Sequence, residues 1–428
     1  MKKTLCSLTA ALILLLIHAA AYAFTLPNTG ETHCYSSYSV INCTNTGQDG
    51  EFNFHPMNFT DNGDQTVTDN NTGLSWDKCS MGQSGADCKT GTTTIYISPG
   101  KPFSSVCSSR GSGWRTPSKK ELTTIVDYSV ASPGPAIMAS FFPNTQQGFY
   151  CTSTPYVGST DYGWFVYFLD GEVAGGPYSG DSCYLRCVRG TETLQKLYDN
   201  GDYTVTDQRT GLMWQQCSAG QTNDPQSKCV GTPTAYGWTN AISYCNTLDF
   251  PQGVYTDWRM PNIKELESIT DDTDNSRIDT TKFPNTPASA YWSSTTNVDF
   301  VDYPQGGYVW GINFNYGSIA NWKVGAGNYV RCVRGLGYFV RLLYGDVSGI
   351  ITLYSTIHDA CVAALDGQSI QAQALVSDEN AACASTSGIH VWLRGGYDNG
   401  FVSNAGFTTV GSLTISGGSI TVENLIMQ

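Results

Sequence analysis

Short runs in which hydrophobic and polar residues alternate recur between residues 59 and 335, and this period of two predicts β-strands. Thr66-Val67-Thr68 follows an Asp-Asn-Gly-Asp turn. A second turn at residues 71–73 leads into a Leu-Ser-Trp run, so we expect a small hairpin there. Aromatic alternating runs at residues 162–169 and 308–316, joined by glycine-rich turns, predict further antiparallel strands.

Helical spacing occurs in a few places. Residues 239–247 predict a helix that places Ala241, Ile242 and Cys245 on one face. The matching stretch in the first half of the chain contains Pro99 and Pro102, so we expect a shorter helix there.

A second helix is expected after each of two Trp-Arg-x-Pro sequences. Ser118 is followed three residues later by Glu121, and Asn262 is followed likewise by Glu265, which is the spacing of a capping box. Apolar residues at helical spacing are then expected to face inward, namely Leu122, Ile125 and Val126.

An internal repeat decides the domain organisation. Six blocks recur in the same order, at residues 61–69 and 199–207, 72–76 and 210–214, 114–117 and 258–261, 120–122 and 264–266, 142–145 and 283–286, and 186–190 and 331–335. They predict two modules, at residues 59–190 and 196–335. Each module has the order hairpin, two helices and several antiparallel strands, so we predict an α+β fold.

The blocks resemble the motifs of the Lcl C-terminal domain family, which is named for collagen-like bacterial adhesins. They read Asp-Asn-Gly-Asp-x-Thr-Val-Thr-Asp, Thr-Gly-Leu-x-Trp, Trp-Arg-x-Pro-x-x-Lys-Glu-Leu, Tyr-Trp-Ser-Ser-Thr and Arg-Cys-Val-Arg-Gly. The fourth block stands at residues 291–295, whereas the first module has Tyr-Cys-Thr-Ser-Thr at residues 150–154. The resemblance implies a fold like C-type lectins and formylglycine-generating enzymes. It also implies a role in attachment, because those adhesins bind sulfated glycosaminoglycans.

Two further segments flank the modules. Residues 24–58 form an N-terminal extension. In residues 338–428 we expect a short helix from Ser355, followed by short strands at residues 412–415 and 419–426. This segment resembles the cap and first rungs of a pectate-lyase-like β-helix. A β-helix-like segment of this size would pack on the second module or offer a strand edge to a partner.

Residues 1–23 predict a secretory signal peptide. Lys2 and Lys3 precede an apolar run at residues 12–17, and Ala21-Tyr22-Ala23 predicts cleavage after Ala23. The alternative, a retained membrane anchor, is disfavoured because the apolar run is short for a bilayer. Cys6 does not lie at the cleavage point, so no lipoprotein anchor is expected. We predict a secreted, periplasmic or cell-surface protein with no transmembrane segment after signal cleavage.

The cysteines predict a disulfide framework. Of 15 cysteines, 14 remain once Cys6 is removed, and an even number in an exported chain indicates disulfides rather than metal thiolates. Cys151 and Cys183 have Trp292 and Asn328 as counterparts, so their joint absence from the second module argues that they pair. Alignment of the two modules gives the predicted bridges Cys79–Cys88, Cys107–Cys187, Cys217–Cys229 and Cys245–Cys332. With Cys151–Cys183 also paired, the bridges Cys34–Cys43 and Cys361–Cys383 remain.

The charge balance is acidic. Removal of Lys2 and Lys3 takes the formal net charge from −13 to −15, and a surface of that sign repels nucleic acid. Charged residues make up 14% of the chain, against about 25% in typical proteins. The 45 glycines and 12% aromatic residues indicate turn-rich β-structure with exposed rings.

The histidines argue against an enzyme. None of the five lies within a module; they are His18, His33, His55, His358 and His390. This excludes histidine-based nucleophilic catalysis and histidine-ligated zinc from the modules. A carboxylate pair for glycoside hydrolysis stays an open alternative, although Glu121 and Glu265 are explained as helix caps. We predict that the protein is not an enzyme.

Two sets of aspartates have a spacing that resembles calcium ligands: Asp61, Asp64 and Asp69, and Asp199, Asp202 and Asp207. The alternative is an Asx turn followed by a strand, since the distal Glu of an EF-hand is missing. Apart from calcium, no cofactor is expected.

Candidate ligand contacts come from the repeated motif and from the loops. Trp114, Arg115, Trp258 and Arg259 either contact ligand or belong to the core with internal carboxylate partners. At least one arginine of each of the pairs Arg186/Arg189 and Arg331/Arg334 is expected to be internal. Aromatic rings on the glycine-rich loops are suited to stacking on sugars or to contact with protein, namely Tyr178, Tyr303, Tyr316 and Trp322.

These observations predict a secreted or surface binding protein that recognises carbohydrate or another surface polymer through two lectin-like modules. The first alternative is a structural component of a cell-envelope or extracellular assembly, docked on another envelope protein by its C-terminal segment. The second alternative is an enzyme that acts on polysaccharide. No nucleic-acid partner is expected.

Overall fold

The computed structural model describes residues 25–36, 39–96, 106–177, 182–191, 195–207, 209–253, 255–300 and 307–335. Beyond residue 335 it describes only the strands named below. The predicted signal peptide, the helix expected from Ser355 and the Cys361–Cys383 bridge lie outside the described residues.

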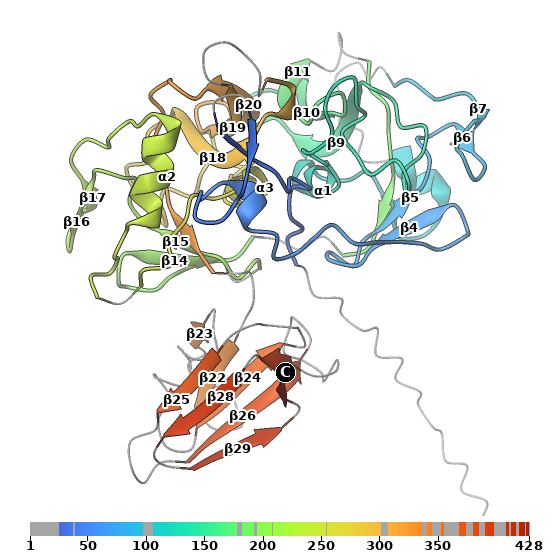
Figure 1. Ribbon diagram of the computed structural model, residues 1–428. Coiled ribbons are helices and arrows are strands. Elements are labelled where there is room, and N and C mark those ends of the chain that lie inside the picture. Colours follow the sequence, from blue (N-terminus) through green and yellow to red (C-terminus); the bar gives the residue numbers. More distant parts are fainter. Residues whose placement is uncertain are drawn as a thin grey trace, which may run out of the picture.

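The first module is built mainly of strands (Figure 1). Its elements are β3 (Phe59–Asp61), β4 (Thr66–Asp69), β5 (Ser75–Asp77), β6 (Gln83–Ser84), β7 (Thr90–Gly91), the 3-10 helix η2 (Val106–Arg110), β8 (Trp114–Arg115), α1 (Lys119–Thr124), β9 (Phe149–Pro155), β10 (Tyr162–Tyr167), β11 (Val173–Pro177) and β12 (Val188–Arg189).

The second module repeats this order with one longer helix. Its elements are β13 (Leu197–Asp199), β14 (Thr204–Asp207), β15 (Met213–Gln215), β16 (Thr222–Asp224), β17 (Lys228–Val230), α2 (Trp238–Asn246), α3 (Ile263–Ser268), β18 (Ala290–Thr296), η3 (Val298–Phe300), β19 (Tyr308–Asn313), β20 (Ser318–Lys323) and β21 (Val333–Arg334).

The prediction of an α+β fold of C-type-lectin-like or formylglycine-generating-enzyme-like modules is wrong, because the chain is mainly β. The predicted helices are short: α1 and α3 have six residues each, and the first-module counterpart of α2 is only the 3-10 helix η2. Both six-residue helices begin with the expected capping boxes, Ser118 with Glu121 and Asn262 with Glu265. The helix starts were therefore predicted correctly, but antiparallel strands provide most of the structure.

The two modules share one sheet instead of forming separate bodies. A six-stranded antiparallel sheet has the order β18-β19-β20-β11-β10-β9, so β11 of the first module lies beside β20 of the second. Val173 pairs with Ile319 at this junction. The two residues occupy equivalent places in their modules, so a pseudo-twofold axis passes between them.

The hydrophobic core also runs through the junction. One cluster of buried residues contains Trp76, Trp164, Trp214 and Trp310, two from each module. Tyr128 of the first module packs edge-on against Trp310 of the second, with ring centroids 5.4 Å apart. Because this apolar surface is buried between the modules, we expect them to unfold together.

Six of the predicted disulfides are present. They are Cys34–Cys43, Cys79–Cys88, Cys107–Cys187, Cys151–Cys183, Cys217–Cys229 and Cys245–Cys332. In the second module Trp292 takes the place of Cys151, and its indole Nε1 donates to the carbonyl O of Tyr236 at 2.7 Å.

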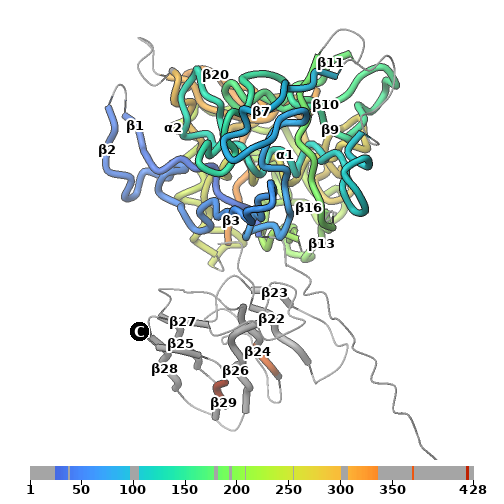
Figure 2. Tube along the Cα trace, turned by 90° about the vertical axis from the view of Figure 1, so that its right-hand side faces the viewer, coloured from blue at the N-terminus to red at the C-terminus, as the bar shows by residue number. Residues whose placement is uncertain are grey.

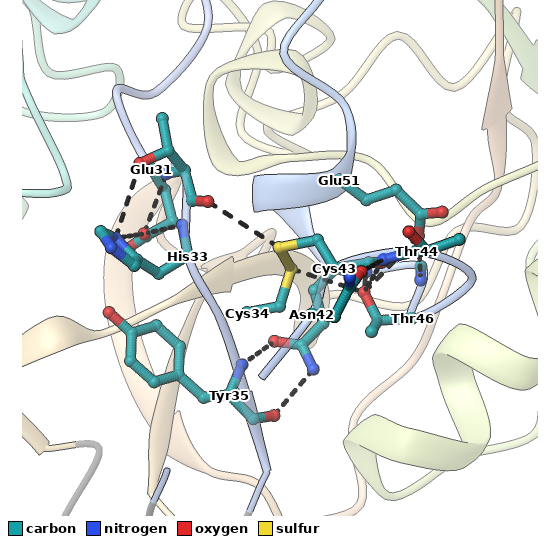
Figure 3. Close-up of a disulfide and its surroundings, with 12 residues drawn as sticks. Glu31, His33, Cys34, Tyr35, Asn42, Cys43, Thr44, Thr46 and Glu51 are labelled. Atoms are coloured by element: carbon teal, nitrogen blue, oxygen red, sulfur yellow. Dashed lines mark hydrogen bonds and ion pairs between the residues drawn. A yellow bond between two sulfur atoms is a disulfide. The ribbon is translucent and has the colours of Figure 1, made fainter. Parts of the chain in front are cut away.

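The N-terminal extension lies across the junction and contacts both modules. It contains β1 (Cys34–Ser36), β2 (Ser39–Ile41) and the 3-10 helix η1 (Asp49–Glu51), and it is drawn in blue in Figures 1 and 2. Figure 3 shows its Cys34–Cys43 disulfide beside Glu51, whose carboxylate accepts from the amides of Asn45 and Gly47 at 2.6 and 2.7 Å. The disulfide and these turn contacts therefore fix the shape of the extension locally.

The C-terminal segment contains parallel strands. Its elements are β22 (Val340–Tyr344), β23 (Thr352–Tyr354), β24 (Gln368–Gln373), β25 (Asn380–Ala384), β26 (His390–Tyr397), β27 (Thr408–Val410), β28 (Ser412–Ser416), β29 (Ser419–Glu423) and β30 (Leu425–Met427). Strand β22 pairs antiparallel with β23 and β24, whereas β24-β26-β29, β25-β28 and β27-β30 form three parallel ladders.

Candidate functional site

A groove with a volume of about 560 Å³ lies where the two modules meet. From the first module it is lined by Ser118, Lys120, Glu121, Ser153, Thr154 and Pro155. From the second module and the segment just before it, it is lined by Gln195, Leu197, Arg209, Thr270, Asp271, Asp272, Thr273 and Asp279. A volume of this size is within the usual range for ligand-binding clefts. Twelve of the fourteen lining residues are polar or charged, and Pro155 and Leu197 are apolar.

The two capping boxes and the central sheet position the groove side chains. The capping box at the start of α1 fixes Ser118 and Glu121, and Lys120 lies between them in the first turn of the helix. Strand β9 supplies Thr154, whose hydroxyl accepts the backbone N–H of Lys119 at 2.9 Å. The turn that follows α3 supplies the opposite wall, from Thr270 to Thr273.

A buried ion cluster lies behind the groove. Lys119 is fully buried, and its ammonium nitrogen lies 2.9 Å from a carboxylate oxygen of Glu267 and 2.5 Å from one of Asp272. The same nitrogen lies 4.3 Å from the ring centroid of Trp164. Removing an ammonium group from water is costly, and the ion pairs and the ring contact compensate for that cost. The two carboxylates belong to the second module and Trp164 to the first, so the cluster joins the modules. Lys119 thus fixes the position of the Asp272 carboxylate at the groove.

Lys120 ties the two walls together. Its ammonium group donates to the carbonyls of Ser268 and Thr270 at 3.0 and 2.5 Å. Burial lowers the pKa of Lys120 from 10.5 to about 8, although Asp272 counteracts this. Since an ammonium group has three protons and two are used, Lys120 can donate one further hydrogen bond.

The four carboxylates of the groove already have partners. Glu121 binds Arg115 at 2.5 Å and Asp272 binds Lys119. Asp271 and Asp279 accept from the hydroxyls of Thr273 and Thr281 in their own turns, each at 2.6 Å. The arrangement offers hydrogen-bond donors and acceptors to a polar ligand.

The repeated Trp-Arg motif lies outside this groove, and its residues have internal partners. Arg259 is buried and forms two hydrogen bonds with Glu265, at 2.6 and 2.7 Å. Arg115 binds Glu121 in the same way. Trp258 is buried, whereas Trp114 is half-buried between the guanidinium groups of two arginines. The geometry therefore agrees with the alternative in which these residues belong to the core and the arginines have internal carboxylate partners.

Of the four candidate rings on the loops, two lie in the part of the chain that the structure describes. Tyr316 is exposed, and Trp322 is half-buried against the core of the second module. Tyr178 and Tyr303 lie outside the described residues.

The last arginines of the repeat behave as expected. Arg186 and Arg331 are fully buried, and each donates to the backbone carbonyl of the last residue of a strand, Asp77 of β5 or Gln215 of β15. Arg334 is also buried and binds Asp257 at 2.6 Å. At least one arginine of each pair is thus internal.

The six candidate calcium ligands form Asx-type turns. Asp61 and Asp64 accept the amides of Gly63 and Thr66 at 3.0 and 3.1 Å, and Asp199 and Asp202 repeat these bonds. Asp69 and Asp207 each accept a threonine hydroxyl three residues later. Within the described part of the chain, no group of three or more His, Cys, Asp or Glu residues could hold a metal ion. The geometry matches the alternative interpretation as turns.

Differences between the repeats could have identified the groove. Lys119, Thr123 and Tyr128 have Ile263, Glu267 and Asp272 as their counterparts. A lysine in one module and two new carboxylates in the other indicate a contact across the junction. Sequence reasoning missed Thr154 and Asp272 because it treated the modules as independent.

A second hollow of about 390 Å³ lies between the N-terminal extension and the second module. Its lining includes Tyr35 and Ile41 of the extension and Trp238 and Tyr308 of the module.

Among the residues that the structure describes, no helix has the length and apolar character needed to cross a membrane.

Comparison with known proteins places both modules in one family. The family described as the Lcl C-terminal domain matches the chain twice, over residues 65–189 and 203–334. No curated protein and no solved structure matches the chain.

Proposed function

The chain belongs to the Lcl C-terminal domain family, of which it carries two copies in tandem, and we propose that it is an exported binding or adhesion protein. Six disulfides support an oxidising compartment outside the cytoplasm. In our proposal the protein is secreted, periplasmic or attached to the cell surface.

The groove between the modules is the ligand site in this proposal, and its ligand is a carbohydrate or another surface polymer. The observation that carries the proposal is a groove of about 560 Å³ that is lined by both modules, mostly with polar residues. Hydroxyl, carboxylate and ammonium groups suit the many hydroxyls of a sugar polymer. The acidic net charge of −13 favours neutral polymers over sulfated ones.

A glycan array and a heparin column, both with the mature protein, test this function. Thr273 is exposed at the groove, so Thr273→Trp should fill it and abolish retention of the glycan that the wild type binds. Ser129→Trp is the matched control, because Ser129 forms the same turn in the first module. The carbohydrate proposal fails if the wild type retains no glycan, or if Thr273→Trp binds as well as Ser129→Trp.

The enzyme alternative has its own readout. Glycans retained by the protein are expected to be recovered intact by mass spectrometry after prolonged incubation. Shortened products would instead favour an enzyme that acts on polysaccharide.

A second candidate function is a structural role in a cell-envelope or extracellular assembly. It is favoured by the C-terminal segment, for which the three parallel ladders support a short β-helix. In such a stack the edge of the last strands is where a strand of a partner would pair. Deletion of residues 338–428 should release the protein from its assembly, and unchanged localisation would contradict this role.

A further inference from the structure

Each lining residue of the open groove has a counterpart in the other module, and those counterparts form a second groove. Lys120, Thr154 and Asp272 correspond to Lys264, Thr295 and Tyr128. Gln195 and Arg209 correspond to Met57 and Asn71. The second groove is not open, because the N-terminal extension lies in it.

The extension satisfies three hydrogen-bond donors of the second groove. The ammonium group of Lys264 donates to the carbonyl of Asn28, and the amide of Tyr128 donates to the carbonyl of Thr29, both at 2.8 Å. The hydroxyl of Thr295 donates to the carboxylate of Asp49 at 2.6 Å. Two successive peptide carbonyls and one carboxylate thus bind three donors from the two modules.

Close packing shows that this groove fits a polypeptide backbone. Gly30 has a positive φ of 93° and lies so close to Asp127 that an added Cβ would be 2.2 Å from its Oδ1. Asp49 is buried, and its carboxylate also accepts from the hydroxyl of Thr29 at 2.6 Å. The extension is therefore held by the backbone carbonyls of Asn28 and Thr29 and by the buried side chain of Asp49, which belongs to η1.

The open groove presents the same donors without the peptide. The amides of Val126 and Thr270 donate to equivalent carbonyls, those of Thr123 and Glu267. The amides of Asp127 and Asp271 likewise donate to the equivalent carbonyls of Ala136 and Arg277. At the next position Tyr128 donates to the extension, whereas no acceptor for the amide of Asp272 is found among the described residues. The hydroxyl of Thr154 accepts the amide of Lys119, as Thr295 accepts that of Ile263, and the part of the chain that the structure describes provides no acceptor for its own proton.

We propose that the open groove binds a polypeptide segment that offers two successive backbone carbonyls and a carboxylate. Thr154 and Lys120 would take the roles that Thr295 and Lys264 have toward the extension, and the amide of Asp272 that of Tyr128. A peptide is favoured over a glycan because the same donor set holds a peptide in the second groove. The inference rests on the proposed function in that both use this groove as the ligand site.

The partner differs from the extension in its side chains. Met57 and Val126 of the filled groove are replaced by Gln195 and Thr270 in the open one, and Asn71 by Arg209. The bound segment should therefore carry polar side chains where the extension is apolar. The backbone and carboxylate contacts are common to both grooves, so the extension itself is a usable probe.

The test uses a fluorescent synthetic peptide of residues 25–54, with the Cys34–Cys43 disulfide closed, and the full mature protein. Anisotropy should report one saturable site. Thr154→Val in the protein should weaken binding about 10- to 100-fold, the usual loss for one hydrogen bond to a charged group. Thr295→Val is the matched control, because that hydroxyl faces the protein's own extension, and it should leave the affinity unchanged.

A double-mutant cycle sharpens the result. Asp49→Asn in the peptide should weaken binding by about the same factor as Thr154→Val in the protein. The two changes together should weaken binding no more than either alone, because both break the same contact. Absence of saturable binding overturns the inference, and so does equal loss with Thr154→Val and Thr295→Val. Peptide binding without glycan retention would support this inference and remove the carbohydrate proposal. Glycan retention without peptide binding would remove this inference and support the carbohydrate proposal.

Discussion

Lys120 of the first module and Lys264 of the second are counterparts, and each reaches across to the helix of the other module. The ammonium nitrogen of Lys120 lies 3.0 Å from the carbonyl O of Ser268, and that of Lys264 lies 2.8 Å from the carbonyl O of Thr124. Ser268 and Thr124 are themselves counterparts. The lysine of the repeated Lys-Glu-Leu sequence therefore holds the two modules together and ties the extension to them.

Replacement of Lys264 should destabilise the protein more than replacement of Lys120. Lys264→Met leaves the carbonyls of Thr124 and Asn28 without their donor, which should lower the free energy of unfolding by about 2–4 kcal/mol. Lys120 is half-buried, so water can reach its partners and Lys120→Met should cost about 1–2 kcal/mol. Guanidinium unfolding curves measure both, and equal losses would contradict the different burial of the two lysines.

The motif arginines should prove structural. Arg259→Gln leaves the carboxylate of Glu265 buried without its partner and should cost about 3–5 kcal/mol. Arg115 is about a quarter exposed, with a side-chain exposure of 27%, so Arg115→Gln should cost about 1 kcal/mol. Both variants should retain the wild-type glycan and peptide affinities once folded. Loss of binding in a variant that unfolds normally would return these residues to the ligand site.

The repeat allowed much of the local structure to be predicted from sequence. The capping boxes of Ser118 and Asn262, the buried arginines and five of the six disulfides follow from comparing one module with the other. These features depend on residues within one module or on a matched pair, so their spacing along the chain is informative.

The fold class and the groove could not be predicted in the same way. The capping boxes indicate where helices start, but α1 and α3 end after six residues, so strands dominate. The pairing of Val173 with Ile319 joins residues that are far apart in the sequence and have no motif of their own. The groove is formed by this junction, and a search for exposed rings such as Tyr316 examined other surfaces.

The disulfide unique to the first module should contribute strongly to stability. Cys151 and Cys183 close a loop with a sequence separation of 32, so replacing both by alanine should cost about 4 kcal/mol. Replacing Cys245 and Cys332, with a separation of 87, should cost about 1 kcal/mol more. Differential scanning calorimetry of the two double variants measures the difference. A reversed order would indicate that packing by the sulfur atoms outweighs the loop entropy.

Calcium removal should leave the protein unchanged. Asp61 and Asp199 are bound by Lys78 and Lys228, and the hydrogen bond from Lys78 lowers the pKa of Asp61. A metal ion would have to displace these lysines and the turn amides. We expect the same thermal midpoint in excess calcium and in excess EDTA. A rise in the midpoint with calcium, abolished by Asp64→Asn, would establish a calcium site instead.

Docking of the extension should depend on pH through Asp49. Burial raises the pKa of Asp49 from 3.8 to about 7, and burial likewise raises the pKa of Glu31 from 4.5 to about 7. Nearby Glu265 also raises the pKa of Asp49, while the hydroxyls of Thr29 and Thr295 lower it. A carboxyl whose pKa is higher when docked favours docking below its ordinary pKa, and this contribution is lost as the pH rises toward about 7.

Lys264, which contacts the extension, acts in a different pH range. Burial lowers its pKa from 10.5 to about 7, so its contribution is present above about 10.5 and is lost as the pH falls toward about 7. Between about pH 4 and pH 6 only the two carboxyls change, and docking should weaken as the pH rises.

Hydrogen exchange of residues 28–52, corrected for intrinsic rates, should therefore give greater protection at about pH 5 than at about pH 7. Asp49→Asn keeps an acceptor without the charge and should reduce this difference, and Glu31→Gln should reduce it further. Greater protection at the higher pH in the wild type would show that ionised Asp49 is stabilised in its buried position.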